Sequence, residues 1–217
     1  MTQDPAAATT ATAAATTTKQ RLLAAAREEF AAHGIAGARV DRIAELAGVN
    51  KERIYGYFGS KQKLFDQVVS EALDELAEAV PLRPGDDPAE YVGRVYDFHR
   101  ANPVLVRLSL WEGLHYRDEA LPDEERRATH YERKVAALAE TFGTEVSPEV
   151  TSCLLGLIAL AAWPSAVPQM SRLILGAGPR PDLRAQLVEF ARRAVADSLP
   201  AAGAGGGGGG GDAGAGA

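Results

Sequence analysis

The residues best suited to chemistry form a short charged cluster, Lys51, Glu52 and Arg53, which directly follows Asn50. Asn is a favoured N-cap residue, so these three side chains would project from the first turn of a helix. Lys and Arg can donate hydrogen bonds to guanine O6 and N7, and Glu can accept one from cytosine N4. The cluster therefore indicates readout of base edges in DNA, although a solvated, charged helix end would have the same composition.

The residues around this cluster have the spacing of a helix-turn-helix over residues 40–55. A short helix is expected to end before Gly48, which suits the left-handed backbone of the turn. Ala44 is small where the second helix must cross it closely, and Val49 and Ile54 are expected to fill the angle between the two helices. In such a motif the second helix lies in the major groove and presents its first turn to the bases.

Charge is distributed unevenly along the chain, whose overall net charge is −6. Residues 18–69 contain nine Lys or Arg against six Asp or Glu, a net charge of +3. Residues 70–217 contain fourteen against twenty-two, a net charge of −8. This segregation is expected if only the first part of the chain faces the phosphates of DNA.

Helix-capping signals recur along the chain and strand signals are scarce, which predicts an all-α fold. Ser60, Asp87 with Pro88, Asn102 with Pro103, and Ser147 with Pro148 each precede an expected helix. The expected helices span residues 19–33, 40–47, 51–57, 61–80, 88–101, 103–116, 122–142, 148–163 and 182–198.

Residues 19–69 resemble the DNA-binding domain of the TetR family of bacterial transcriptional repressors. The matching positions are Leu22, Ala26, Phe30, Gly34, Ile43, Ala44, Ala47, Gly48, Val49, Ile54, Tyr55, Tyr57, Phe58, Ser60 and Lys61. Gly56 departs from the family pattern, which usually has a bulkier residue before the second aromatic. The resemblance implies a regulator that works as a homodimer on a palindromic operator and leaves it when a small-molecule effector binds. Two alternatives are a ligand-dependent activator and a helical small-molecule-binding protein without specific DNA binding.

The resemblance also implies a domain order. Residues 1–17 would be a disordered arm, 18–62 a three-helix helix-turn-helix DNA-binding domain, and 63–199 a larger helical ligand-binding and dimerisation domain. Residues 200–217 would be a disordered Gly/Ala-rich tail, since neither end can bury apolar area.

Three further DNA contacts follow from the resemblance. Tyr55 and Tyr57 should touch sugar-phosphate or thymine methyl groups, and Lys61 should bind a phosphate at the start of the fourth helix. Arg39 stands near the start of the second helix, where the family usually has Thr or Ser; it can attract a phosphate but cannot cap the helix. The full expected DNA-binding set is Arg39, Asn50, Lys51, Glu52, Arg53, Tyr55, Tyr57 and Lys61.

Aromatic and imidazole side chains gather in the middle of the chain. Such residues usually form core, but their apolar bodies and polar tips also suit a ligand pocket. The expected ligand-binding set is Tyr96, Phe98, His99, Trp111 and His115. By resemblance, the helices at 148–163 and 182–198 would form a four-helix dimer interface with their symmetry mates, whereas the alternative is a purely internal core.

Other functional classes find little support in the sequence. It has no Gly-rich phosphate loop, no His-Glu-x-x-His pair and no Gly-x-Ser-x-Gly elbow, so we expect no enzyme, catalytic residue, cofactor or metal site. Cys153 is the one cysteine and is expected to be a buried thiol. The apolar stretch 153–163 is shorter than a membrane span, and residues 1–17 lack the features of a secretory signal, so a cytoplasmic protein with no membrane partner is expected.

Overall fold

The computed structural model describes residues 5–176 and 182–198, with side chains from Thr18 onward. Every regular element in these ranges is an α-helix, which agrees with the all-α prediction. The helices are α1 (Pro5–Gly37), α2 (Val40–Ala47), α3 (Lys51–Phe58), α4 (Lys61–Ala79), α5 (Pro88–Ala101), α6 (Pro103–Tyr116), α7 (Glu124–Thr141), α8 (Pro148–Ala166), α9 (Pro168–Leu175) and α10 (Leu183–Ser198).

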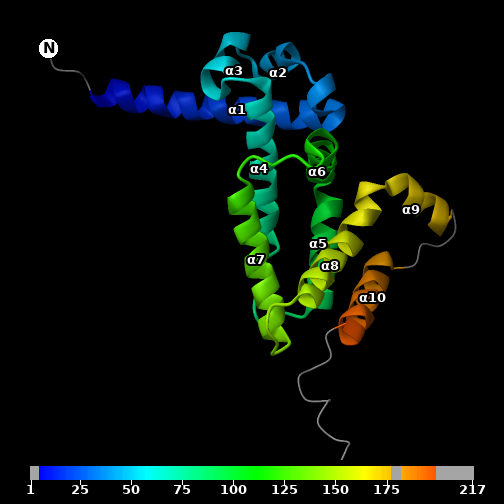
Figure 1. The fold of residues 1–217 in the computed structure, drawn as a ribbon. Coiled ribbons are helices and arrows are strands. Elements are labelled where there is room, and N and C mark those ends of the chain that lie inside the picture. The colour runs from blue at the N-terminus through cyan, green and yellow to red at the C-terminus, as the bar shows by residue number, and fades with distance from the viewer. Residues whose placement is uncertain (1–4, 177–181, 199–217) are drawn as a thin grey trace, which may run out of the picture.

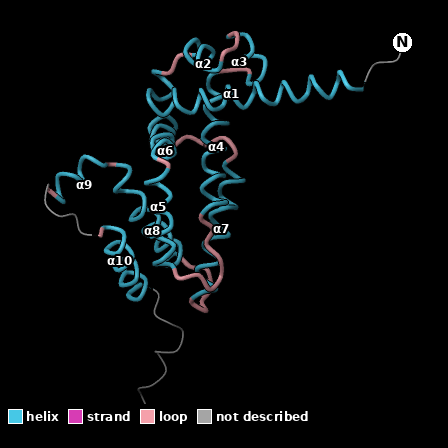
Figure 2. The backbone as a smooth tube through the Cα atoms, turned by 180° about the vertical axis from the view of Figure 1, so that it is seen from behind, coloured by secondary structure: helices cyan, strands magenta, loops and turns pink. Residues whose placement is uncertain are grey.

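The helices form a head, made of α1, α2 and α3, and a body, made of α4 to α10. Helices α1, α2 and α3 lie together at one end of the molecule, and α4 runs from them along the body (Figure 1). The view from behind shows the same order, with α5, α7, α8 and α10 away from the head (Figure 2). Helix α6 packs against α1 and so joins the body to the head.

The first hydrophobic core lies in the head and extends into α4 and α6. Phe30 of α1 and Phe65 of α4 are fully buried and meet edge to face, with ring centroids 5.1 Å apart. Leu105 and Leu108 of α6 are buried in the same cluster. Helix α4 therefore passes without a break across the domain boundary predicted between residues 62 and 63.

The second hydrophobic core fills the body between α5, α7, α8 and α10. Tyr91 of α5 and Leu138 of α7 are almost completely buried there, together with Leu154 of α8 and Ala191 of α10. Burial of these apolar side chains is the main force that holds the four helices together.

Helix α1 is longer than the sequence predicted, because it begins at Pro5 and not near residue 19. Residues 5–17 were expected to belong to a disordered arm. Their many alanines have the highest helix propensity, and they extend the helix away from the head (Figure 1). Residues 1–4 and the predicted tail at 200–217 lie outside the described residues.

Side-chain caps fix several helix starts where the sequence predicted them. Ser60 Oγ accepts from the N–H of Lys63 at 3.1 Å, and Asp87 Oδ1 accepts from the N–H of Ala89 at 2.8 Å. Ser147 caps α8 in the same way. Asn102 does not cap α6; its amide donates to a carbonyl of the preceding helix.

A second departure from the expected helices comes after residue 163. Helix α8 continues through Pro164 to Ala166, although proline removes one hydrogen bond of the helix. Pro168 then begins α9, which the sequence analysis did not predict. Helix α9 buries none of its residues, although its apolar residues are spaced as in an amphipathic helix.

Candidate nucleic-acid interface and effector cavity

Helices α2 and α3 form the predicted helix-turn-helix. Gly48 ends α2 with φ 64° and ψ 42°, in the left-handed region that favours glycine. Ala44 is 5% exposed at the crossing, Ile54 is fully buried and Val49 packs against the same core. The angle between the two helices is therefore set by small and apolar residues, as the spacing indicated.

Helix α3 has one buried and one exposed face. Ile54 and Phe58 point into the core, while Tyr57 is half-buried beside it. Asn50 and the first-turn side chains are exposed, and Tyr55 is 45% exposed. The exposed residues of the predicted DNA-binding set are Arg39, Asn50, Lys51, Glu52, Arg53 and Tyr55.

The N-terminal end of α3 is held by contacts other than the predicted cap. Asn50 occupies the N-cap position, but its side chain makes no capping hydrogen bond, so that expectation is wrong. Its backbone carbonyl accepts from the N–H of Arg53 at 3.1 Å. Lys51 Nζ lies 2.8 Å from Asp41 Oδ1 of α2, and this hydrogen bond raises the pKa of Lys51.

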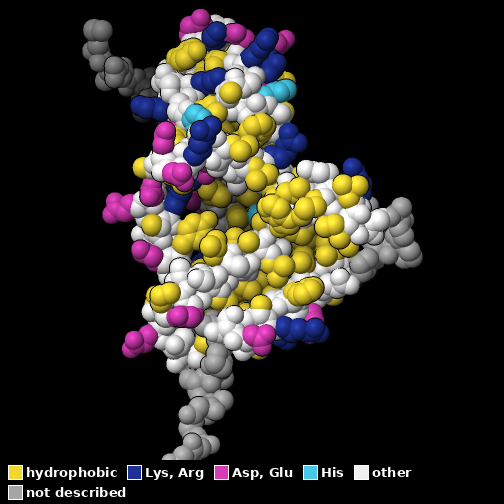
Figure 3. Space-filling view, turned by 45° about the vertical axis from the view of Figure 1, so that its right-hand side comes forward, with side chains coloured by type: hydrophobic (Ala, Val, Ile, Leu, Met, Phe, Trp, Pro, Cys, Tyr) yellow, Lys and Arg dark blue, Asp and Glu magenta, His cyan; other side chains and the backbone are white. Residues whose placement is uncertain are grey.

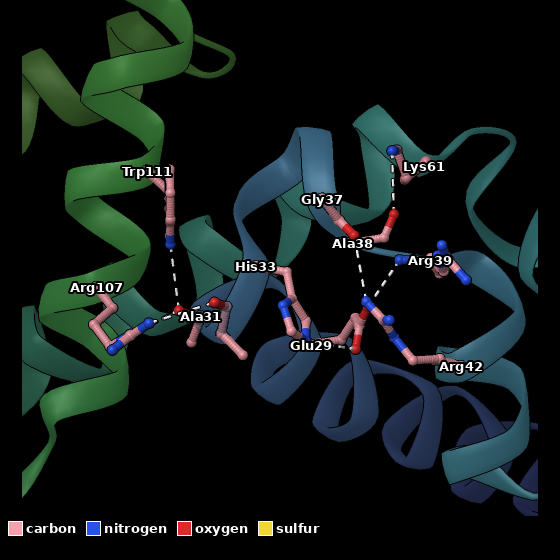
Figure 4. A network of polar contacts seen from close by, with 11 residues as sticks. Glu29, Ala31, His33, Gly37, Ala38, Arg39, Arg42, Lys61, Arg107 and Trp111 are labelled. Atoms are coloured by element: carbon pink, nitrogen blue, oxygen red, sulfur yellow. Dashed lines mark hydrogen bonds and ion pairs between the residues drawn. The ribbon is translucent and has the colours of Figure 1, made fainter.

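A buried carboxylate on α1 positions the start of α2. Glu29 is only 5% exposed, and its Oε1 accepts from the backbone N–H of Arg39 and from Nε of Arg42, both at 2.8 Å (Figure 4). Burial acts to raise the pKa of Glu29, but the hydrogen bonds from Arg42 and Arg39 outweigh it and hold the pKa below its usual value. Glu29 thus anchors the chain where no side chain of α2 caps it, and the guanidinium of Arg39 stays exposed.

Lys61 lies in the first turn of α4 and connects that helix to the segment between α1 and α2. Its Nζ donates to the carbonyl oxygen of Ala38 at 3.3 Å, across the connection between α1 and α2 (Figure 4). A half-buried ammonium at a helix N-terminus, where N–H groups also converge, suits a phosphate. Its contact with DNA stays a prediction, as do those of the other residues in the set.

Two side chains of helix α6 form hydrogen bonds with the backbone of α1. Arg107 Nε donates to the carbonyl oxygen of Ala31 at 2.7 Å, and Trp111 Nε1 donates to the same oxygen at 3.3 Å (Figure 4). Both contacts lie just before Gly34, where α1 leaves helical geometry with φ 63° and ψ 177°. The kinked end of α1 is therefore fastened to the body.

A cavity of about 1120 Å³ lies in the body, between α4, α5, α6, α7 and α8. Its wall combines apolar side chains with six acidic and five basic ones, and its volume is close to that of small-molecule sites. The lining includes Leu76, His99, Leu105, Glu112, Arg127 and Ile158.

Of the five predicted ligand-binding residues, His99 lines this cavity and the other four lie elsewhere. Tyr96 is buried in the second core, and Phe98 is half-buried between the two cores. Trp111 packs on α1, and His115 is exposed. Aromatic side chains satisfy core packing as readily as ligand binding, so their clustering in the sequence did not locate the cavity.

Three charged residues of the cavity wall are almost fully buried, and none of them belongs to the predicted ligand-binding set. Glu112 and Lys134 are 7% and 6% exposed, and the Arg127 side chain is 11% exposed. Arg127 Nη1 lies 2.9 Å from both carboxylate oxygens of Glu112. The available signal was Glu112, the one acidic residue in the apolar sequence of α6.

Apolar side chains are exposed on the surface formed by α8 and α10. Leu155 and Trp163 of α8 are 70% and 53% exposed, and Phe190 of α10 is 66% exposed. Hydrophobic side chains gather over this side of the molecule in Figure 3. Helix α8 is also long and apolar enough to cross a membrane. The core helix of a soluble protein can have the same length and composition, so this is only weak evidence for a membrane span.

Comparisons with known proteins agree with this architecture. Residues 22–68 match the model of bacterial regulatory proteins of the tetR family, and residues 87–193 match a tetracyclin repressor-like C-terminal domain. The chain is 43% identical over 172 residues to the HTH-type transcriptional repressor SCO4008 of Streptomyces coelicolor, covering 77% of this chain and 89% of that protein. It is 32% identical over 105 residues to the repressor NicS of Pseudomonas putida, covering 46% of this chain and 50% of NicS. The crystal structure of the putative transcriptional regulator SCO4942 from Streptomyces coelicolor superimposes with a TM-score of 0.67 at 33% identity, covering 85% of this chain and 99% of that one.

The helix-turn-helix head on an all-helical body defines a DNA-binding transcriptional regulator. The chain belongs to the TetR family, and the curated relatives above are repressors. Members of this family are regulators and not enzymes; they bind DNA operators and act as dimers with small-molecule effectors.

Proposed function

We propose that two copies of this chain form a cytoplasmic homodimer, which represses transcription from a palindromic operator and leaves it when a small molecule fills the cavity between α4 and α8. The observation that carries the proposal is the exposed first turn of α3 above its buried Ile54 and Phe58. This arrangement lets Lys51, Glu52 and Arg53 enter a major groove without disturbing the core.

A dimer is required because a single α3 contacts too few base pairs to specify a site in a genome. Two such helices on adjacent half-sites lie about 34–36 Å apart, one turn of DNA. The exposed Leu155, Trp163 and Phe190 supply an apolar surface for the second copy, next to a groove of about 700 Å³ between α8 and α10.

Helix α6 provides the route from the cavity to the head. Glu112 lines the cavity, and its neighbour Trp111 holds the carbonyl of Ala31 on α1. A ligand that moves α6 would therefore shift the head and change the spacing of the two α3 helices. Release requires the ligand to bind this shifted state more tightly than the DNA-competent state.

The proposal is tested by binding of the purified protein to the intergenic DNA upstream of its own gene and to random duplex, across a salt series. Selective binding of one dimer to a palindromic segment is the expected result. Weak binding of equal strength to both duplexes at every salt concentration would contradict operator recognition. If a ligand that binds the cavity strengthens DNA binding, the protein is an activator-type or co-repressed regulator.

A further inference from the structure

The wall of the α4–α8 cavity includes six acidic and five basic side chains, and among those that are almost fully buried positive charge exceeds negative charge. Three charged side chains that line it are almost fully buried, namely Glu112, Arg127 and Lys134. Glu112 neutralises Arg127 through its carboxylate. Lys134 Nζ donates to the hydroxyl of Tyr91 at 2.9 Å and forms no ion pair with any described residue. One buried positive charge is thus left without a partner of opposite charge.

Unused hydrogen-bonding groups lie at the same wall. Arg127 contacts Glu112 through Nη1, while its Nε and Nη2 are buried and make no hydrogen bond to any described residue. The Nε–Nη2 edge of a guanidinium is one of its two-donor forks, which match the two oxygens of a carboxylate. His99 is only 6% exposed, and its Nδ1 also makes no hydrogen bond to any described residue.

These groups lie on two antiparallel helices. Helices α5 and α7 run in opposite directions along the body (Figure 1), and Tyr91 and Lys134 mark a level at which they meet. His99 lies two turns further along α5 and Arg127 about two turns back along α7, which places both toward α6 and Glu112. At 1.5 Å per residue, this separates His99 and Arg127 from the level of Tyr91 and Lys134 by about 10–12 Å along the helices.

We propose that the effector is an organic acid, bound as its anion, whose carboxylate takes the Nε–Nη2 edge of Arg127 while its apolar part lies along the cavity toward Ile158. This inference rests on the proposed role of the cavity as the effector site. The charge of Lys134 stabilises the anion from the same wall. Leaving buried donors without acceptors is unfavourable, and the ligand removes that cost.

The same geometry connects acid binding to α6. The two free nitrogens of Arg127 are screened from solvent, so the acid must reorient the guanidinium to reach them. Its carboxylate then competes with Glu112 for Arg127. Any shift of Glu112 is passed to Trp111, the adjacent residue that holds α1.

The test uses the full-length protein and two matched sets of probes: 1-naphthoate with 1-naphthamide and 1-naphthylmethylammonium, and decanoate with decanamide and decylammonium. Affinity is measured by isothermal titration calorimetry. At least one acid is expected to bind about tenfold or more tightly than its amide and its ammonium analogue. Neither analogue has a carboxylate, so neither can form the charge-assisted bidentate pair with Arg127.

Two variants with opposite expected effects test the site itself. Arg127→Lys keeps a positive charge beside Glu112 but loses the fork, so affinity for the acid should fall about tenfold. Glu112→Gln removes the competing carboxylate, so affinity for the acid should rise. Arg83→Lys, at an exposed arginine in the loop before α5, should change neither. Circular dichroism of each variant verifies folding.

Three outcomes would overturn the inference: no binding of either acid at millimolar concentration, equal affinity for the three members of each set, or tightest binding of an ammonium probe that is lost in Glu112→Gln. Release of operator DNA is measured separately. An acid that binds with the expected variant pattern but leaves DNA bound would refute the effector role and keep the acid site. Operator binding without any acid binding would refute the acid site and keep the regulator.

Discussion

The indole ring of Trp111 in α6 packs directly on Gly34 of α1, where a β-carbon would lie only 2.7 Å from Cδ2 and Cε3 of the ring. Gly34 also has a φ of 63°, in a region that other residues rarely adopt. The fit between the body and the head therefore depends on a position without a side chain. A change at Gly34 acts on the backbone and on the interface at once.

Gly34→Ala is expected to destabilise the protein by about 1–3 kcal/mol, because it adds strain at positive φ and a steric clash with Trp111. The free energy of unfolding in urea measures this effect. Gly113→Ala is the control, since Gly113 lies inside α6 and a β-carbon there meets nothing within 4 Å. That variant should be more stable than the wild type by up to about 1 kcal/mol. Equal stability of the Gly34→Ala variant and the wild type would contradict the close fit.

Glu29→Gln is expected to loosen the start of α2 and to change acid unfolding. The folded pKa of Glu29 lies below 4.5, so its ionised form contributes stability that is fully present above about pH 4.5 and is lost as the pH falls through the folded pKa. At pH 7 the variant should lose about 1–3 kcal/mol, because Arg42 and the N–H of Arg39 lose a charged acceptor. Below pH 4.5 its stability should fall less steeply than that of the wild type.

Urea unfolding of Glu29→Gln at several pH values between 3 and 7 provides the measurement. Glu28→Gln is the matched control, since Glu28 is the adjacent, exposed carboxylate on the same helix. A Glu28 variant that behaves like the Glu29 variant would assign the effect to net charge and not to the buried network.

Lys134→Met is expected to stabilise the protein at neutral pH. Burial lowers the pKa of Lys134 from 10.5 to about 8, so below pH 8 the folded state holds a charged ammonium at a cost of at most about 3 kcal/mol. As the pH rises from about 8 to 10.5, the unfolded state binds more protons, and the wild type should gain stability. The loss of the hydrogen bond to Tyr91 offsets about 1 kcal/mol of the gain.

The measurement is the free energy of unfolding of wild type and variant at pH 7 and pH 9.5. The difference between the two proteins should shrink at the higher pH. Lys63→Met, at an exposed lysine of α4, should show neither effect. A lysine that lowers the stability of the folded protein is expected at this position if its positive charge stabilises a bound anionic ligand.

The helix-turn-helix could be predicted from the sequence because its determinants are local. Gly48 fixes the turn through its own backbone, and Ala44 and Ile54 meet across a few residues. The Ser60 and Asp87 caps likewise act within three residues of their own position. For this reason most of the predicted helix bounds in the middle of the chain agree with the structure to within one or two residues.

The effector cavity could not be predicted in the same way, because its wall joins positions far apart in the sequence. His99, Glu112 and Arg127 lie on three different helices, and nothing in the spacing of the chain brings them together. The aromatic cluster drew attention instead to Trp111, whose true neighbour is α1. The buried position of Glu29 could not be predicted for a related reason. An acidic residue in an amphipathic helix gives no sign that it will form a buried ion pair with Arg42 on the next helix.

Two substitutions should separate base readout from phosphate binding. Arg53→Ala, in the exposed first turn of α3, should weaken binding to the operator by about 1–3 kcal/mol and leave random duplex nearly unchanged. Lys61→Ala should weaken both and reduce the salt slope by about one. Electrophoretic mobility shifts across a salt series distinguish the two patterns. Equal losses on every duplex for Arg53→Ala would remove Arg53 from base readout.

Phe190→Asp should dissociate the dimer, because it places a charge in the apolar surface of α8 and α10 that the second copy is proposed to cover. Leu114→Asp is the matched control: Leu114 of α6 is 66% exposed, as is Phe190, but it lies outside that surface. Sedimentation equilibrium should therefore give a monomer for the first variant and a dimer for the second. Because two half-sites must be bound at once, the Phe190 variant should also lose operator binding at concentrations where the Leu114 variant retains it. A Phe190→Asp protein that remains dimeric would move the interface away from α10.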